Sequence, residues 1–224
     1  MTTPISEMSA GQAGWSWTVE PPARWLVIPS TVTEDEKDVA QWERAAAAVV
    51  RASFGPQPEG DDEPIELDDE ESAALDQAAA DAVANLREFA DGMAPEGSRV
   101  VAAVGVLGRS PVPVLVSVRT SDPGAPDEGL MAALGATGGC PAAPPNIEHL
   151  DLPDGDGVRV TRLDVGEVSG GAWLSIALGR RSEQPSAVVD TVLVWRTQDV
   201  LLGSAMLELL DELLPAVRII RGTR

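Results

Sequence analysis

Cysteine, histidine and tyrosine are nearly missing from this 224-residue chain, which has one cysteine, one histidine and no tyrosine. A lone cysteine, Cys140, excludes an internal disulfide. A lone histidine, His149, excludes zinc sites built from several His or Cys ligands. No apolar run reaches the roughly 18 residues that cross a bilayer, and the first residues do not resemble a signal peptide. We therefore expect a cytoplasmic protein without membrane insertion.

Positive charge is also scarce, because 36 acidic side chains outnumber 16 basic ones and give a net charge of −20. Residues 34–96 hold 19 of the acids and only 4 of the bases. Such a field repels phosphate backbones and anionic lipids, so nucleic acid is excluded as a partner. A basic protein partner is compatible with this charge. The alternative interpretation is that the acids only keep the protein soluble.

The acidic side chains mark the organisation of the first half. Residues 1–13 are predicted to be a flexible tail, and 14–224 a single domain with an acidic connector at 55–71. An apolar stripe predicts a helix before the connector, and it contains Val39, Trp42, Ala46, Val49 and Val50. A second helix is predicted from Asp68, with Glu71 at capping-box spacing, to about Gly92. Its apolar stripe is Leu75, Ala79, Val83, Leu86 and Ala90.

The second half is rich in β-branched residues and predicts several strands, at 99–108, 112–120, 158–165, 172–179 and 187–196. In "VRVTRLDV" the alternation places Val158, Val160 and Leu163 toward a core and Arg159 and Arg162 outward. Asp199 lies in the cap region of a final helix, whose apolar stripe is Leu202, Met206, Leu209, Leu210, Leu213 and Val217. We predict an α/β fold: a single α/β/α sandwich with a largely antiparallel central sheet.

The closing segment "TVLVWRTQDVLLGSAMLELLDELLPAVRI" resembles the C-terminal signature of a group of small actinobacterial proteins with the Mog1p/PsbP-like α/β/α sandwich fold. Trp195 takes the place of the aromatic on the outgoing strand, Thr197 that of the turn, and 206–211 that of the helix motif. Pro22, Trp25 and Ile28 stand where those proteins have their first hairpin. The resemblance implies a binding or assembly factor, associated with a secretion system or the envelope, rather than an enzyme.

No recognisable catalytic motif is present, and we predict no catalytic residue, metal or cofactor. Cys140, His149 and Asp151 have the residue types of a thiol site but no local signature. "DLPDGDG" faintly resembles a calcium loop through Asp151, Asp154 and Asp156, but Asp-Gly pairs are more typical of a hairpin turn. Gly105 and Gly108 follow a strand without the further residues of a phosphate-binding loop.

Tryptophan is the remaining candidate for function. Trp25, Trp42, Trp173 and Trp195 are predicted to be core residues, whereas Trp15 and Trp17 share one face of a short strand. We predict a non-enzymatic protein-binding or assembly module with a protein partner of basic character. The predicted partner-binding residues are Trp15, Trp17, Asp61, Asp62, Glu63, Asp68, Asp69 and Glu70. The alternatives are a hydrolase or small-ligand-binding enzyme with a pocket between sheet and helices, and a structural subunit of a larger complex.

Overall fold

The computed structural model describes residues 15–54, 68–139, 141–153, 155–165, 171–184 and 186–221. The chain divides into two compact units. Unit 1 comprises Met1–Ala23 and Val114–Arg224, and unit 2 comprises Arg24–Pro113. Each unit has its own mixture of strands and helices, so each is described separately. The prediction of one domain over 14–224 stays a prediction.

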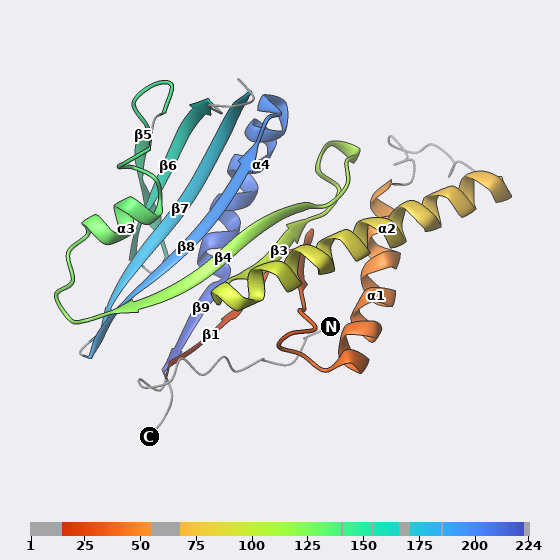
Figure 1. Cartoon of the computed structure of the whole chain (residues 1–224), viewed down its shortest axis with the longest axis horizontal. Coiled ribbons are helices and arrows are strands. Elements are labelled where there is room, and N and C mark those ends of the chain that lie inside the picture. The colour runs from red at the N-terminus through yellow and green to blue at the C-terminus, as the bar shows by residue number, and fades with distance from the viewer. Residues whose placement is uncertain are drawn as a thin grey trace. The chain divides into compact units, whose positions relative to one another are not determined.

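Unit 1 contains an antiparallel sheet in the order β4-β8-β7-β6-β5 (Figure 1). Three long neighbouring strands form its centre: β6 (Gly155–Val165), β7 (Ala172–Gln184) and β8 (Ala187–Thr197). They are flanked by β4 (Val112–Ser121), which belongs to unit 1 from Val114 on, and by β5 (Asn146–Leu152). The centre is dominated by β-branched and leucine side chains, which suit a strand covered on both faces.

Two helices cover opposite faces of this sheet (Figure 1). Leu130 and Leu134, in and just after α3 (Glu128–Ala133), pack with Ala177 and the other small residues of one face. Leu174 lies on the opposite face, because side chains alternate along a strand, and it packs against Gly203 of α4 (Val200–Leu213). The predicted α/β/α layering and antiparallel sheet are therefore confirmed.

A second, two-stranded sheet in unit 1 joins the two ends of the sequence. β1 (Trp15–Val19) pairs antiparallel with β9 (Val217–Arg221), so that Trp17 faces Ile219. A short 3-10 turn, η3 (Leu214–Ala216), connects α4 to β9 and places Pro215 just after the helix. The family resemblance implied an early hairpin, but β1 pairs with β9 and not with the next strand in sequence.

Unit 2 consists of two strands and two long helices. β2 (Trp25–Ile28) pairs antiparallel with β3 (Arg99–Ala103), while α1 (Glu36–Phe54) and α2 (Asp69–Met93) pack on each other through Ala46, Val50, Ala79 and Val83. Short 3-10 turns at η1 (Ala94–Glu96) and η2 (Val106–Gly108) lie on either side of β3. Most of the predicted apolar stripe of each helix is buried, although Val49 is exposed.

The sequence predictions for single elements differ from the structure in three places. Val217 lies in β9 rather than in the last helix, which ends at Leu213. β5 and β9 were not predicted, because neither has an apolar alternation that stands apart from its neighbours. The strand predicted at 99–108 ends at Ala103, and a 3-10 turn at Val106–Gly108 leads from it into β4.

Candidate functional site

The most unusual surface of unit 1 is a group of exposed apolar side chains where the long strands and α4 meet. We call this group the apolar end; its members are Leu163, Val165, Trp173, Val200 and Leu201. Leu201 is 74% exposed and Val200 66%, while Trp173 is 37% exposed. Large apolar residues that gather on a surface are more informative than the same residues scattered singly. The apolar end is therefore the candidate site.

Strand register and helix direction place these five residues at the same end of the long strands, with Trp173 on the opposite face of the sheet from Leu163 and Val165. Leu163 was predicted to face the core, but it is 40% exposed. β6 ends at Val165, β7 begins at Ala172, and Val165 pairs with Ala172 while Leu163 pairs with Leu174. Leu174 in turn lies under Gly203, in the first turns of α4. The start of α4 thus sits over the same end of the sheet where β6 stops. Val200 and Leu201 precede the buried side of the helix and remain in solvent.

Trp173 was predicted to be a core residue, and this prediction is wrong because its side chain is exposed. Trp173 lies on the face of the sheet that α3 covers, but α3 packs on residues further along the strands: Val160, Ala177 and Val192. Alternation along a strand shows which face a side chain occupies and not how far the covering helix extends. Trp25 and Trp195 are buried as predicted, and Trp42 is partly buried against the α1–α2 cluster.

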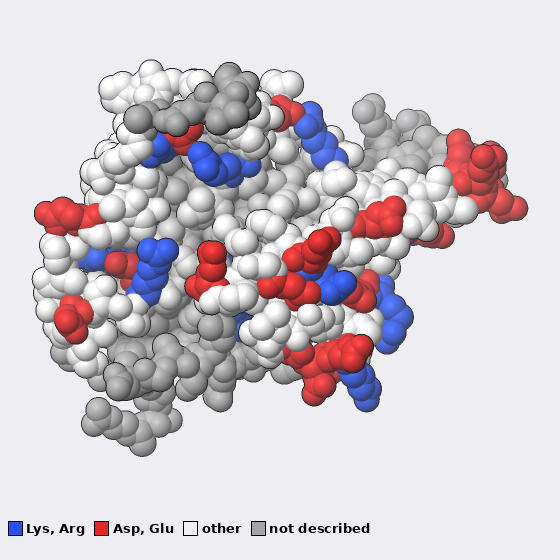
Figure 2. All heavy atoms as spheres, viewed as in Figure 1, with Lys and Arg blue, Asp and Glu red and all other residues white. Residues whose placement is uncertain are grey.

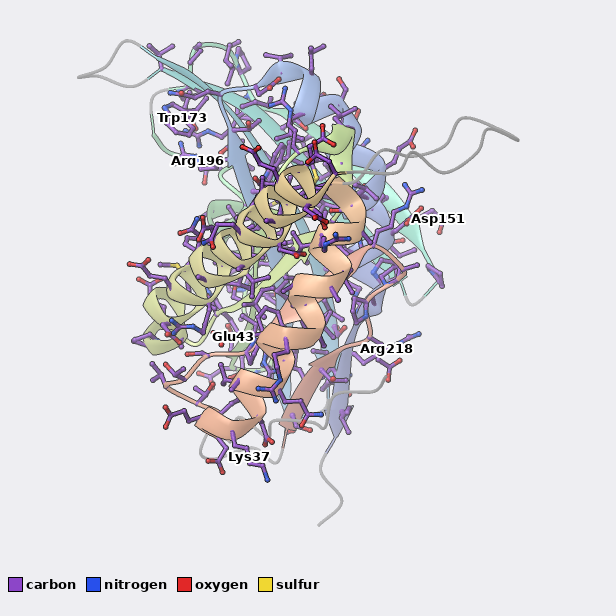
Figure 3. All side chains as sticks on the ribbon, turned by 90° about the vertical axis from the view of Figure 1, so that its right-hand side faces the viewer. Lys37, Glu43, Asp151, Trp173, Arg196 and Arg218 are labelled. Carbon is purple, nitrogen blue, oxygen red and sulfur yellow. The ribbon has the colours of Figure 1, made fainter. Side chains whose placement is uncertain are left out.

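Beside Trp173 lies a cluster of Arg162, Asp164 and Arg196. Asp164 pairs with Trp173 across the strands, accepts hydrogen bonds from Arg162 Nε and Nη2 on its own strand, and accepts one of 2.9 Å from Arg196 on β8. Because β7 lies between β6 and β8, the Arg196–Asp164 bond passes over β7 next to Trp173. Figure 3 shows Trp173 and Arg196 at the same end of the unit.

The Asp164 carboxylate is neutralised by this cluster. Burial alone would raise its pKa, but the hydrogen bonds and charges of Arg162 and Arg196 lower the pKa below the ordinary value for aspartate. Arg162 also donates to the Gly135 carbonyl oxygen in the loop after α3, at 2.9 Å. The guanidinium of Arg196 is about half exposed. The cluster of two arginines and one aspartate therefore carries one net positive charge beside the apolar end.

Arg159 and Arg162 were predicted to point outward, and this is wrong. Arg159 binds Glu148 on β5 and Asp211 on α4, which ties the edge strand and the helix to β6. Arg162 lies on the same face as Val160 and is largely covered. Sequence alternation could not reveal this, because an arginine with two carboxylate partners can occupy a covered position that an unpaired arginine would avoid.

The predicted acidic partner site lies at the start of α2. Asp68 accepts from the backbone N–H of Glu71 at 2.8 Å, and Glu71 accepts in return from the N–H of Asp68, which confirms the predicted capping box. Asp69 and Glu70 are exposed in the first turn, where the helix dipole favours anions. Figure 2 shows acidic side chains gathered at this end of α2. Asp61, Asp62 and Glu63 lie outside the described residues.

The other predicted candidates are spread over unit 1. Trp17 is partly buried on β1, and for Trp15 only the backbone is described. His149 is exposed on β5, and Cys140 lies outside the described residues. In the "DLPDGDG" segment, Asp151 of β5 pairs with Asp156 of β6, while Asp154 lies outside the described residues. In the described part of the chain, no three His, Cys, Asp or Glu side chains are placed to hold a metal ion.

Val200 and Leu201 were missed by sequence reasoning, although a signal was present. The stripe of the final helix explains Leu202, Met206 and Leu210, but it leaves two large apolar residues outside it at the start of the helix. Apolar residues outside the buried stripe of an amphipathic helix have no core to occupy. Among the described helices, none has the length and apolar composition needed to cross a membrane.

The fold and this surface together define a mixed α/β protein with an exposed apolar end next to an arginine–aspartate cluster. No family model and no curated protein matches the chain, so membership of the Mog1p/PsbP-like group stays a prediction. Among solved structures, the chain is similar to the crystal structure of LpqN involved in cell envelope biogenesis of Mycobacterium tuberculosis. The two are 8% identical with a TM-score of 0.48, over 94% of this chain and 87% of that chain. This similarity is too low to carry a conclusion about function.

Proposed function

We propose that this protein is a protein-binding or assembly module that meets its partner at the apolar end of unit 1. The observation that supports the proposal is the exposure of five large apolar side chains at one end of the long strands and the start of α4: Leu163, Val165, Val200 and Leu201 toward the face that α4 covers, and Trp173 on the opposite face. Contiguous exposed apolar groups are disfavoured in water unless a partner covers them. Tryptophan and arginine, present here as Trp173 and Arg196, are enriched among the residues that dominate binding energy.

A photo-crosslinking experiment in the host cell tests this proposal. A photoreactive phenylalanine derivative replaces Leu201 in the full chain, and the crosslinked products are identified by mass spectrometry. The matched control carries the same group at Val49, an exposed apolar position on α1 in unit 2. We expect a discrete product, with a protein, from position 201 and none from position 49. Equal or absent labelling at both positions would contradict the proposal.

A second candidate surface is the start of α2, where Asp69 and Glu70 are exposed and have no basic partner among the described residues. A basic partner bound there would be released by salt, because exposed charges are screened. Neutralising Asp61, Asp62, Glu63, Asp69 and Glu70 to their amides tests this prediction without disturbing the Asp68–Glu71 capping box. Unchanged affinity for the crosslinked partner would remove the acidic surface from the binding site.

The remaining sequence predictions are not part of this proposal. Association with a secretion system or the envelope stays a prediction, as does the cytoplasmic location. The hydrolase alternative and the structural-subunit alternative also stay predictions. A Cys140→Ala variant that retains a measured activity would eliminate the thiol route.

A further inference from the structure

We propose that the outer edge of β5 binds an extended, basic segment of a partner protein as an additional strand of the unit 1 sheet. This edge is separate from the apolar end, because Asp151 of β5 pairs with Asp156 at the start of β6, whereas Trp173 pairs with Asp164 at the end of β6. Figure 3 shows Asp151 and Trp173 well apart from each other. The edge of β5 is therefore a second surface, independent of the function proposed for the apolar end.

β5 is the last strand of the unit 1 sheet and pairs with β6 alone (Figure 1). In an antiparallel pair, every second residue of an edge strand directs its backbone N–H and C=O away from the partner strand. Among the described residues, no backbone group outside β6 bonds to residues 146–152. A row of outward donors and acceptors of this kind is a template on which a further strand can form.

Proline and bulges, two devices that often protect an edge strand, are absent from β5. Its residues, Asn146–Leu152, pair with β6 in an unbroken register. Ile147 is 42% exposed, and Asp151 on the same face is exposed as well. On the other face the Leu152 side chain leans inward over Gly157 of β6, where an added Cβ atom would lie 2.7 Å from Leu152 Cδ1. β5 can therefore accept a neighbouring strand without a change in its backbone.

Charge at this edge determines which kind of segment fits. Asp151 and Asp156 lie directly opposite each other, and neither has a basic partner among the described residues. Like charges in directly opposite positions of a sheet repel each other. A lysine or arginine opposite Asp151 in an added strand offsets this repulsion. A second copy of β5 contains no lysine or arginine and cannot supply this charge.

The spacing along β5 defines the segment further. Side chains on one face of a strand recur at every second residue, so Ile147 and Asp151, four positions apart, lie on the same face. An antiparallel neighbour, the arrangement of every strand pair in the unit 1 sheet, runs in the opposite direction. Its basic residue opposite Asp151 therefore comes first, and an apolar residue opposite Ile147 follows four positions later.

Binding of a synthetic peptide to the full chain tests the inference. The peptide TKTVTVT, with blocked ends and a fluorescent label, has the required order of a basic and an apolar residue, and its residues favour strands. We expect anisotropy to give a dissociation constant on the order of 100 μM, weakened about threefold or more between roughly 0.05 and 0.5 M NaCl. Hydrogen exchange should slow in residues 146–152. Absence of binding up to about 1 mM peptide would overturn the inference.

Methylation of the peptide backbone distinguishes strand addition from a purely ionic contact. The N–H groups of alternate residues point to opposite edges of a strand, so only one edge of the peptide faces β5. One peptide is methylated at its odd-numbered backbone nitrogens and another at its even-numbered ones. We expect one of the two to lose binding and the other to retain most of it. Equal affinity of the two would contradict strand addition.

Asp151→Lys and Glu208→Lys form a matched pair of variants. Each replaces an exposed acid of unit 1 by lysine, but Glu208 lies on α4 and not on β5. Lysine at 151 stands opposite Asp156, so the hairpin should be retained, and circular dichroism verifies this. We expect Asp151→Lys to weaken peptide binding about three- to tenfold and Glu208→Lys to change it less than about twofold. The peptide TETVTVT should bind Asp151→Lys more tightly than it binds the unchanged protein.

The outcomes separate the β5 edge from the apolar end. Equal weakening by both variants would mean that net charge, and not the β5 edge, attracts the peptide, and it would contradict the inference. Slower exchange around Leu201 instead of in residues 146–152 would exclude β5 and leave the binding role of the apolar end intact. Slower exchange in residues 146–152, together with no crosslinked product from position 201, would support the β5 edge and remove the function proposed for the apolar end.

Discussion

Arginine has a different role in each of the two units. In unit 1 the arginines lie on the sheet, and Arg181 is 12% exposed and bonded to Asp190, itself 9% exposed, and to Asp127. In unit 2, Arg51 and Arg87 lie on the outside of the helix pair, where Arg51 reaches Asp76 and Arg87 reaches Glu43 and Asp91. Strand register fixes the first kind of pair in a covered place, whereas the second kind is open to water and to salt.

This difference shows that charged side chains contribute to the stability of the fold mainly in unit 1. Unit 1 contains 17 acidic and 9 basic residues in the full sequence, and unit 2 contains 19 and 7. Several acids of unit 1 are committed to covered arginines, and removing one partner leaves a desolvated charge. Most acids of unit 2 are hydrated, so they affect solubility and long-range attraction more than the fold.

The largest expected effect is the loss of the covered pair in unit 1. Arg181→Ala leaves Asp190 covered without its main cation, and we expect unfolding to become easier by about 3–5 kcal/mol. Arg51→Ala, the counterpart on the helix pair, should cost at most about 1 kcal/mol. Denaturant unfolding followed by circular dichroism measures both. Similar losses for the two variants would show that burial does not distinguish the two kinds of pair.

Truncation of a covered apolar residue tests the same contrast in the cores. Leu210 of α4 is fully buried, and Leu210→Ala should cost about 2–5 kcal/mol through the cavity it leaves. Val83→Ala removes two carbons between α1 and α2 and should cost about 1–2 kcal/mol. Hydrogen exchange assigns each loss to its own unit. A larger loss of unfolding free energy for Val83→Ala than for Leu210→Ala would contradict this prediction.

A smaller effect is expected at the start of α2. Asp68→Ala removes the side chain that accepts from the Glu71 N–H, and a lost N-cap costs about 1 kcal/mol. The neighbouring Asp69→Ala keeps the cap and should cost a few tenths of that through the dipole alone. Amide exchange in the first two turns of α2 measures the fraying. Equal fraying in both variants would mean that the charge of the aspartates, and not the N-cap hydrogen bond, stabilises the start of α2.

The elements that the sequence predicted correctly are those with local signals. The Asp68–Glu71 capping box, the stripe of α2 and the Asp199 cap of α4 lie within a few residues of one another and need no tertiary information. The pairing of β1 with β9 joins residues about 200 positions apart, and no local pattern predicts it. The sandwich class could be predicted because strands and amphipathic helices must cover one another.

The candidate site was harder to predict, for a physical reason. Its position depends on where a covering helix stops, which decides that Trp173 is exposed while Trp195 is buried. It also depends on which carboxylate reaches Arg162, since that contact allows an arginine on a covered face. Both are properties of neighbours distant in sequence. The acidic residues 61–63, predicted to bind a partner, lie outside the described chain and stay a prediction.

The smallest expected effect concerns pH, and it compares Asp164 of unit 1 with Asp91 of unit 2. Burial opposes ionisation of both, but arginines lower the pKa of Asp164, whereas the hydroxyl and backbone donors of Ser30 and Thr31, more than Arg87, lower that of Asp91. When the pKa of a carboxyl group is lower in the folded than in the unfolded state, ionisation stabilises the fold at pH values above the unfolded-state pKa, near 4. This stabilisation is lost as the pH falls through the folded-state pKa.

Asp164→Asn should therefore flatten the fall of stability between pH 5 and pH 3, and so should Asp91→Asn. Adding 0.5 M NaCl should reduce the Asp164 contribution more, because Arg196 is half exposed and its charge is screened, while uncharged donors are not. Denaturant midpoints at several pH values, with and without salt, give the two differences. An identical response of both variants to salt would mean that Asp164 is held by the geometry of its hydrogen bonds rather than by the charge of its arginines.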